Sequence, residues 1–156
     1  MLKRLRERAG SESGFTLIEL LVVMLILGIL AAIAIPAFLS QKNKANDSNM
    51  KAQARSMQTA IETYSTEHNG AYTPTPTLAQ LQAIEPTISG GTIVSTGNTY
   101  TVTSAAAQGS GNVFSIQRIA SGVTRRDCGV GTVGTNRGQG GCFATATTVN
   151  GQTNYW

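Results

Sequence analysis

One long run of apolar residues constrains this chain more than any other feature of its sequence. Residues 20–41 are twenty-two consecutive positions without a charged side chain, and nearly all of them are apolar. As an α-helix, such a run would reach about 33 Å, against a hydrocarbon thickness of about 30 Å in a bilayer. The sequence therefore predicts a helix over residues 15–41 that can cross a membrane.

Basic residues cluster directly before this run. Lys3, Arg4, Arg6 and Arg8 all precede it. Because short cytoplasmic segments carry an excess of Lys and Arg, the N-terminus is expected in the cytoplasm and everything after residue 41 outside. The chain is thus predicted to enter the cytoplasmic membrane as a single-pass precursor.

Three other interpretations of the apolar run are open. A cleaved secretory signal would use Ala32-Ile33-Ala34 as its small-residue site, although apolar sequence continues to Leu39 and Glu19 lies where the signal's hydrophobic region would begin. A plain, uncleaved membrane anchor satisfies the same hydropathy pattern. A buried core helix of a soluble protein fits poorly at this length.

Glu19 separates these interpretations. A carboxylate at membrane depth costs at least a few kcal/mol, so an ionisable residue there is by default functional and needs a partner. If the chain were cut before Phe15, the new α-amino group would supply a positive charge about one helical turn from Glu19. The sequence therefore favours cleavage after Gly14, which would create the partner that Glu19 needs.

The residues around Glu19 form a motif. They read Gly14-Phe15-Thr16-Leu17-Ile18-Glu19, followed by Leu20-Leu21-Val22-Val23. This motif resembles the class III signal of type IV prepilins and type II secretion pseudopilins. The resemblance implies that a membrane peptidase removes residues 1–14 as a leader by cleaving after Gly14, and that Phe15 is then N-methylated. It also implies that Glu19 fixes subunit register by pairing with the terminal amine of an adjacent subunit.

The same resemblance implies a function and a set of partners. The chain would be a structural subunit, or pilin, of a type IV pilus, found first in the membrane and then in an extracellular filament. Its partners would be identical or related pilin subunits in a helical homopolymer, the prepilin peptidase and methyltransferase, the membrane platform with its assembly ATPase, and the lipid bilayer. A pseudopilin of a type II secretion or DNA-uptake machine shares every N-terminal argument. A membrane-anchored extracellular binding protein is a further hypothesis.

Pro36 lies inside the predicted helix. There it removes a hydrogen bond to Ala32 and crowds that turn, an effect of about 3 kcal/mol in an isolated helix. The sequence therefore predicts a bend or local melting at Pro36, which also resembles the proline that the family has in the middle of this helix. Prolines are, however, common in membrane helices, where neighbours satisfy the freed carbonyl.

The helical pattern continues beyond the apolar run and becomes amphipathic. Apolar residues recur at spacings of three and four, which predicts a stripe on one face of a helix over residues 42–69. The stripe consists of Met50, Ala54, Met57, Ile61 and Tyr64. Asn69-Gly70 then provides a stop signal.

Strand patterns dominate residues 90–156. After a short helix over residues 78–84, we expect strands at residues 92–95, 99–104, 112–119 and 142–149. Short strands joined by tight turns predict an antiparallel meander whose apolar face covers the helical stripe. The predicted fold class is α+β: a long N-terminal helix, membrane-spanning in its first half and amphipathic in its second, packed on a small antiparallel β-sheet. The globular domain would span residues 42–156.

Cys128 and Cys142 are an even pair in a chain whose C-terminal part is expected outside the cell, so we predict that they form a disulfide. Closing a loop of about fifteen residues contributes about 3 kcal/mol in the chain-entropy model. Pilins of the class that this chain resembles often carry such a bridge near the C-terminus.

The sequence shows no catalytic constellation, so an enzyme is not expected. The G-x-G-x-x-G at residues 129–134 is not followed by a helix pattern, as a dinucleotide site requires, and no cofactor is predicted. His68 and the two cysteines fall short of four zinc ligands. Glu85 and Asp127 offer too few carboxylates for calcium.

A nucleic-acid partner is not expected either. The first fourteen residues hold four of the twelve basic and two of the eight acidic residues, so the rest of the chain carries a net charge of +2. Arg118, Arg125, Arg126 and Arg137 give the distal region a basic character, but stacking aromatic residues are not interleaved with them in sequence.

Overall fold

The computed structural model describes residues 14–134, 141–149 and 152–156. The chain comprises two compact units, residues 1–38 and 39–156, and the boundary between them falls within helix α2 (Leu17–Glu67). The helix had been expected from residue 15 to about residue 68, so its observed ends agree within two residues.

Within its described residues 14–38, the first unit contains one apolar helix. Its large apolar side chains between Leu17 and Phe38 are exposed, from 47% at Val22 to 76% at Leu17, and residues 14–38 contain no second described element that could cover them. The mean hydropathy of an 18-residue window reaches 3.0. Among the described helices, α2 alone is long and apolar enough to cross a membrane by length and composition.

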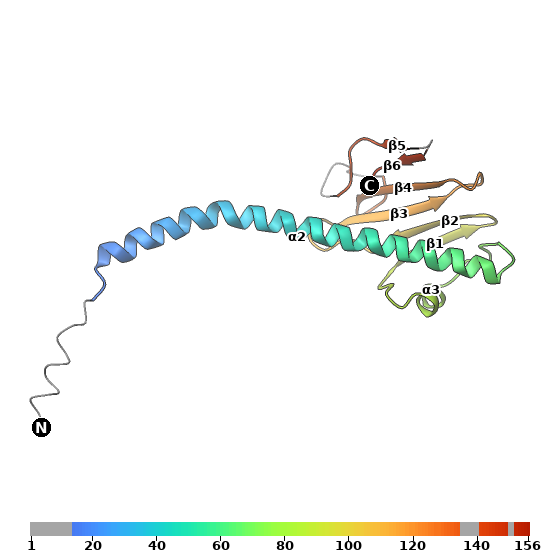
Figure 1. Ribbon diagram of the computed structural model, residues 1–156, viewed down its shortest axis with the longest axis horizontal. Helices are drawn as coiled ribbons and strands as arrows, with labels where there is room; N and C mark the ends of the chain where they lie inside the picture. Colours follow the sequence, from blue (N-terminus) through green and yellow to red (C-terminus); the bar gives the residue numbers. More distant parts are fainter. Residues whose placement is uncertain (1–13, 135–140, 150–151) are drawn as a thin grey trace, which may run out of the picture. The chain divides into compact units, whose positions relative to one another are not determined.

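The second unit combines the rest of α2 with a short helix and a sheet (Figure 1). The described strands are β1 (Gly91–Thr96), β2 (Thr99–Ser104), β3 (Asn112–Arg118), β4 (Thr124–Val130), β5 (Thr147–Val149) and β6 (Gln152–Asn154). Their order across the sheet is β1-β2-β3-β4-β6-β5. Strands β1 to β4 form an antiparallel meander, and β5 and β6 form an antiparallel pair. The α+β fold class is therefore confirmed.

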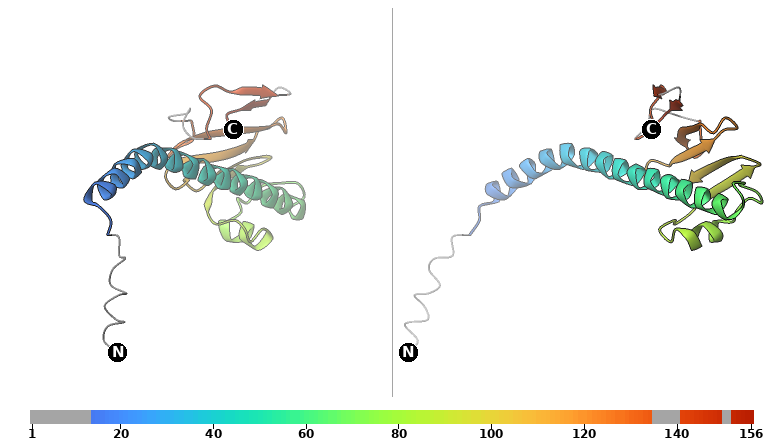
Figure 2. Two further views of the ribbon diagram at one scale, coloured as in Figure 1. Left: turned by 60° about the vertical axis from the view of Figure 1, so that its left-hand side comes forward. Right: turned by 45° about the vertical axis from the view of Figure 1, so that its right-hand side comes forward.

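The short helix α3 (Leu78–Ile84) is the one predicted from the sequence, and it lies beside β1 (Figure 2). It begins with a capping box. The Thr77 backbone N–H donates to the Gln80 side chain at 2.8 Å, and the Gln80 backbone N–H donates to the Thr77 hydroxyl at 3.3 Å.

The core of the second unit lies between the amphipathic part of α2 and one face of β1 to β4 (Figure 1). Four of the five stripe residues are buried, and Met50 is partly buried. Their partners from α3 and the sheet are Leu81, Tyr100, Val102, Phe114 and Ile116. The alternation of buried and half-exposed residues along β2 follows from its two faces, because successive side chains point to opposite sides of a sheet.

Two glycines lie against side chains of α2. Gly91 has φ 141°, and a Cβ there would collide with the Thr103 carbonyl oxygen and with the Met57 side chain. Gly109, in the turn before β3, has φ 88° and lies against the end of the flexible Asn43 side chain. Both backbone conformations favour glycine, and at Gly91 the contact with backbone also excludes a side chain.

The sheet differs from the sequence prediction at its C-terminal end. Strand β4 was not predicted, because its sequence TRRDCGV lacks both alternation and a β-branched core. The strand expected over residues 142–149 is wrong for its first five residues, since β5 begins at Thr147. The polar strand β6 was also missed, and it joins β4 through one parallel pair, Arg126 and Asn154.

Candidate functional site

The predicted cleavage point lies in non-helical chain directly before α2. Gly14, Phe15 and Thr16 precede the first helical residue, and the Phe15 side chain is 88% exposed. A Cβ placed on Gly14 would meet nothing within 4 Å. The described structure of the chain therefore does not require glycine at this position. A requirement for glycine would have to arise from contact with a molecule that binds there.

Thr16 and Glu19 form a capping box at the start of α2. The Thr16 backbone N–H and hydroxyl donate to Glu19 Oε2 at 2.9 and 2.8 Å, and the Glu19 backbone N–H donates to the Thr16 hydroxyl at 3.3 Å. This arrangement satisfies N–H groups that the first helical turn otherwise leaves unpaired, and it places a negative charge at the positive end of the helix dipole.

The capping box adds a role for Glu19 that the sequence argument did not include. Cleavage was expected to supply a positively charged partner, and the carboxylate also accepts two hydrogen bonds from Thr16 in the uncut chain. The signal was present in the sequence, because Thr-x-x-Glu is the capping-box pattern. Pairing of Glu19 with the amine of an adjacent subunit stays a prediction.

Pro36 lies inside α2, and the helix continues without interruption through it. The expected local melting is therefore not observed. A bend at Pro36, and its role when the helix leaves the membrane, stay predictions.

Cys128 and Cys142 are joined in the described structure, as predicted. The S–S distance is 2.06 Å, the Cα atoms are 5.7 Å apart, and both residues are buried. Cys128 lies on β4, so the bridge ties residue 142 to the fourth strand of the meander. The G-x-G-x-x-G motif begins on the same strand and turns back on it, since the Gly134 N–H donates to the Cys128 carbonyl at 3.0 Å.

The C-terminal Trp156 lies among cations that come from different parts of the chain. The Arg126 and Arg55 guanidinium carbons are 5.4 and 5.6 Å from its ring centroid, and the Lys51 ammonium is 5.9 Å away. Its indole N–H donates to the Asp127 carbonyl at 2.9 Å. Aromatic residues are not interleaved with the arginines in sequence, but in three dimensions Arg126 lies over Trp156 and Arg118 lies 5.7 Å from the ring centroid of Tyr72. Arg137 lies outside the described residues. Whether nucleic acid binds is a separate question, and its absence stays a prediction.

Glu62 organises a polar cluster on the sheet side of α2. Its carboxylate accepts hydrogen bonds from Tyr72 at 2.6 Å and Tyr100 at 2.8 Å, and it pairs with Arg118 at 3.3 Å. Burial is the main reason why the pKa of each tyrosine is raised above its ordinary value of 10.0, and the hydrogen bond and charge of Glu62 add to the effect.

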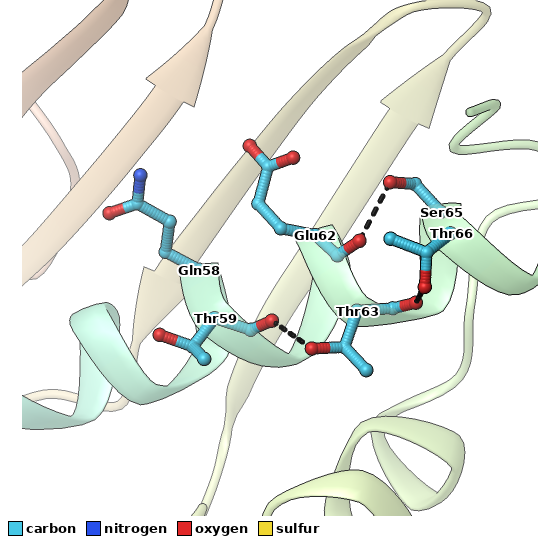
Figure 3. A pocket seen from close by; sticks show the side chains of 6 residues that line it. All are labelled: Gln58, Thr59, Glu62, Thr63, Ser65 and Thr66. Carbon is cyan, nitrogen blue, oxygen red and sulfur yellow. Dashed lines mark hydrogen bonds between the residues drawn. The ribbon is translucent and has the colours of Figure 1, made fainter.

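Glu62 also lines a concavity of about 600 Å³, but the concavity shows no catalytic arrangement (Figure 3). Its hydroxyl groups donate back to helix carbonyls: Thr63 to Thr59 at 2.9 Å, Ser65 to Glu62 at 2.7 Å and Thr66 to Thr63 at 2.7 Å. Within the described residues, there is no group of three His, Cys, Asp or Glu side chains placed to hold a metal ion.

Comparison with known proteins places these features in a family. Residues 10–35 match the family profile described as the prokaryotic N-terminal methylation motif. The chain is 37% identical over 107 residues to the type IV narrow pilus major component PilA5 of Thermus thermophilus, which covers 67% of this chain and 86% of PilA5. The chain belongs to the type IV pilin and pseudopilin family.

Other members of this family match a smaller part of the chain. It is 48% identical over 52 residues to the type IV major fimbrial protein FimA of Dichelobacter nodosus, which is 33% of each protein. It is 31% identical over 81 residues to the type II secretion system core protein G of Klebsiella michiganensis, which is 52% of this chain and 56% of that protein. The chain therefore spans less than two thirds of these two relatives, and pilins and pseudopilins both appear among its matches.

The tyrosine cluster of this pilin-family domain leads to a prediction on alkaline stability. A tyrosine whose pKa is raised on folding contributes stability that is present below pH 10 and is lost as the pH rises, because the unfolded chain releases the proton first. The free energy of unfolding of the full-length protein should therefore fall above about pH 10, and Tyr100 should contribute up to about 1.4 kcal/mol per pH unit to this fall. Urea unfolding followed by Trp156 fluorescence between pH 9 and 11 measures this slope.

Tyr100→Phe should reduce the slope by about 1.4 kcal/mol per pH unit. An equal slope in wild type and Tyr100→Phe would show that Tyr100 does not contribute in this way.

Proposed function

We propose that this chain is the structural subunit of a type IV pilus. The observation that carries the proposal is the combination of a bare apolar helix over residues 17–38 with a separately packed domain over residues 39–156. An apolar surface of this extent needs lipid or other protein chains to cover it. In a membrane-bound precursor, lipid would cover this helix. In a filament, the packed helices of identical subunits would cover it instead.

Processing in this proposal happens at the exposed stretch before α2. A prepilin peptidase cleaves after Gly14, a methyltransferase modifies the amine of Phe15, and residues 1–14 are removed as the leader. A membrane platform and an assembly ATPase then transfer the subunit from the bilayer into the filament. The support is the exposed, non-helical chain at residues 14–16, together with the methylation-motif match over residues 10–35.

A pseudopilin of a type II secretion machine is the second candidate. The similarity to core protein G over 81 residues favours it, and the N-terminal segment fits both roles. The PilA5 match covers more of this chain, which is our reason for placing the pilus first. Deleting the gene distinguishes the two. Loss of long surface filaments supports the pilus, whereas lost secretion or DNA uptake with filaments intact supports a pseudopilin.

The direct test of processing is N-terminal analysis of protein sheared from the cell surface. We expect the mature chain to begin with N-methylated Phe15, which mass spectrometry detects as the loss of residues 1–14 and the gain of one methyl group. Recovery of a surface protein that keeps its first fourteen residues would contradict the proposal. It would favour a membrane-anchored binding protein instead.

A second test separates two roles of Glu19. Glutamine can replace glutamate in a capping box but carries no charge, so Glu19→Gln keeps the helix cap and removes the partner for an amine. If Glu19 sets subunit register by charge, Glu19→Gln and Glu19→Ala should both enter the membrane and both yield about tenfold fewer surface filaments or less, counted by electron microscopy. If only Glu19→Ala lost filaments, Glu19 would be a helix cap and the register role would be wrong.

A further inference from the structure

Asp47 is a buried acid that joins three separate segments of the second unit. It lies on α2 and is 1% exposed. One carboxylate oxygen accepts a hydrogen bond from the Ser110 hydroxyl, and the other accepts from the Asn112 side-chain amide at 2.9 Å and from the Gly141 backbone N–H at 2.7 Å. Asp47 thereby connects α2 to the start of β3 and to the residue before Cys142.

Lys51 lies one helical turn beyond Asp47 and faces the same C-terminal segment. Its ammonium is 5.3 Å from the ring centroid of Phe114 and 5.9 Å from that of Phe143. A Cβ built on Gly141 would lie 2.9 Å from Lys51 Nζ, so the lysine closely approaches the backbone of Gly141. Burial lowers the pKa of Lys51, the charge of Asp47 opposes this shift, and Arg55 adds to it.

These contacts hold both sides of Cys142. Gly141, on one side, is bound by Asp47, and Phe143, on the other, lies beside Lys51 and donates its N–H to the Tyr155 carbonyl at 2.8 Å. Asp47 and Gly141 are 94 positions apart in sequence, and none of these contacts involves the sulfur atoms. The residues on both sides of Cys142 thus make contacts that do not depend on the sulfur atoms.

We propose that Asp47 and Lys51 are positioning residues for the disulfide, which hold residues 141–143 on α2 so that Cys142 lies opposite Cys128 before oxidation and after reduction. The two thiols then lose two protons and two electrons to an oxidising disulfide such as glutathione disulfide. The S–S bond forms within the chain, and two molecules of reduced glutathione are released. The chain can complete its C-terminal packing before the covalent bond exists.

The equilibrium of disulfide formation measures this positioning. Full-length protein is equilibrated with mixtures of reduced and oxidised glutathione, and thiols are trapped and counted by mass spectrometry. Asp47→Asn keeps the size of the side chain but removes its charge. Because hydrogen bonds to charged groups are among the stronger ones, we expect the equilibrium constant for the intramolecular disulfide to fall at least about tenfold.

A core substitution elsewhere is the matched control. Met57→Ala removes a fully buried side chain that contacts Gly91 and should destabilise the domain, but it leaves the contacts of residues 141–143 in place. Its equilibrium constant should stay within about twofold of wild type. Equal constants for wild type and Asp47→Asn, or equal losses in Asp47→Asn and Met57→Ala, would overturn the proposal.

Reduced wild-type protein gives a second test that needs no substitution. Trp156 is the single tryptophan of the chain and contacts Lys51, so its fluorescence reports whether the C-terminal segment is docked. After reduction, the emission should stay that of the oxidised protein, and the Gly141 amide should keep slow hydrogen exchange. Rapid exchange at Gly141 while β1 to β3 stay protected would overturn the proposal, even if Asp47→Asn failed to fold.

Discussion

The structure depends on one constraint, which is that half of its long helix has no covering within its own unit. The large apolar side chains between Leu17 and Phe38 are exposed, and a lone helix cannot bury them. The backbone of such a segment is satisfied internally, so it suits a bilayer, and its side chains equally suit a packed core of identical helices. In the function proposed above, a membrane-anchored precursor becomes a filament subunit, and both states would remove this apolar surface from water.

The second half of α2 buries its apolar side chains within the chain itself. Its stripe packs on the sheet, and Gly91 of β1 leaves room for the Met57 side chain. Acids on the same helix then make specific connections: Glu62 to two tyrosines and Arg118, and Asp47 to Ser110, Asn112 and Gly141. Asp47 is buried and Glu62 is half-buried, and a carboxylate removed from water needs several donors, so these connections restrict how the sheet and the C-terminal segment can sit on the helix.

The sequence predicted the parts whose signals are local. Residues 20–41 are a continuous apolar run, and the stripe from Met50 to Tyr64 and the first three strands carry a periodic pattern. The structure confirms these elements and the helix over residues 78–84. Strand β4 was missed because TRRDCGV has no such pattern and is held by pairing with β3. Asp47 could not be identified as a connecting residue, because its partners lie 63 to 94 positions away in sequence. The capping box of Thr16 and Glu19 could have been predicted from its Thr-x-x-Glu pattern, but the presence of Glu19 had been explained by cleavage alone.

Chemical labelling of the apolar helix tests the central claim most directly. Leu27→Cys places a thiol in the middle of the uncovered segment, and Lys44→Cys places one on the exposed part of α2 in the second unit. In both membranes and sheared surface protein, a water-soluble maleimide should modify Lys44→Cys and leave Leu27→Cys at least about tenfold less reacted, because a thiol surrounded by lipid or packed helices is shielded from water. Equal labelling at the two positions would show that the helix is exposed to water and would contradict the account.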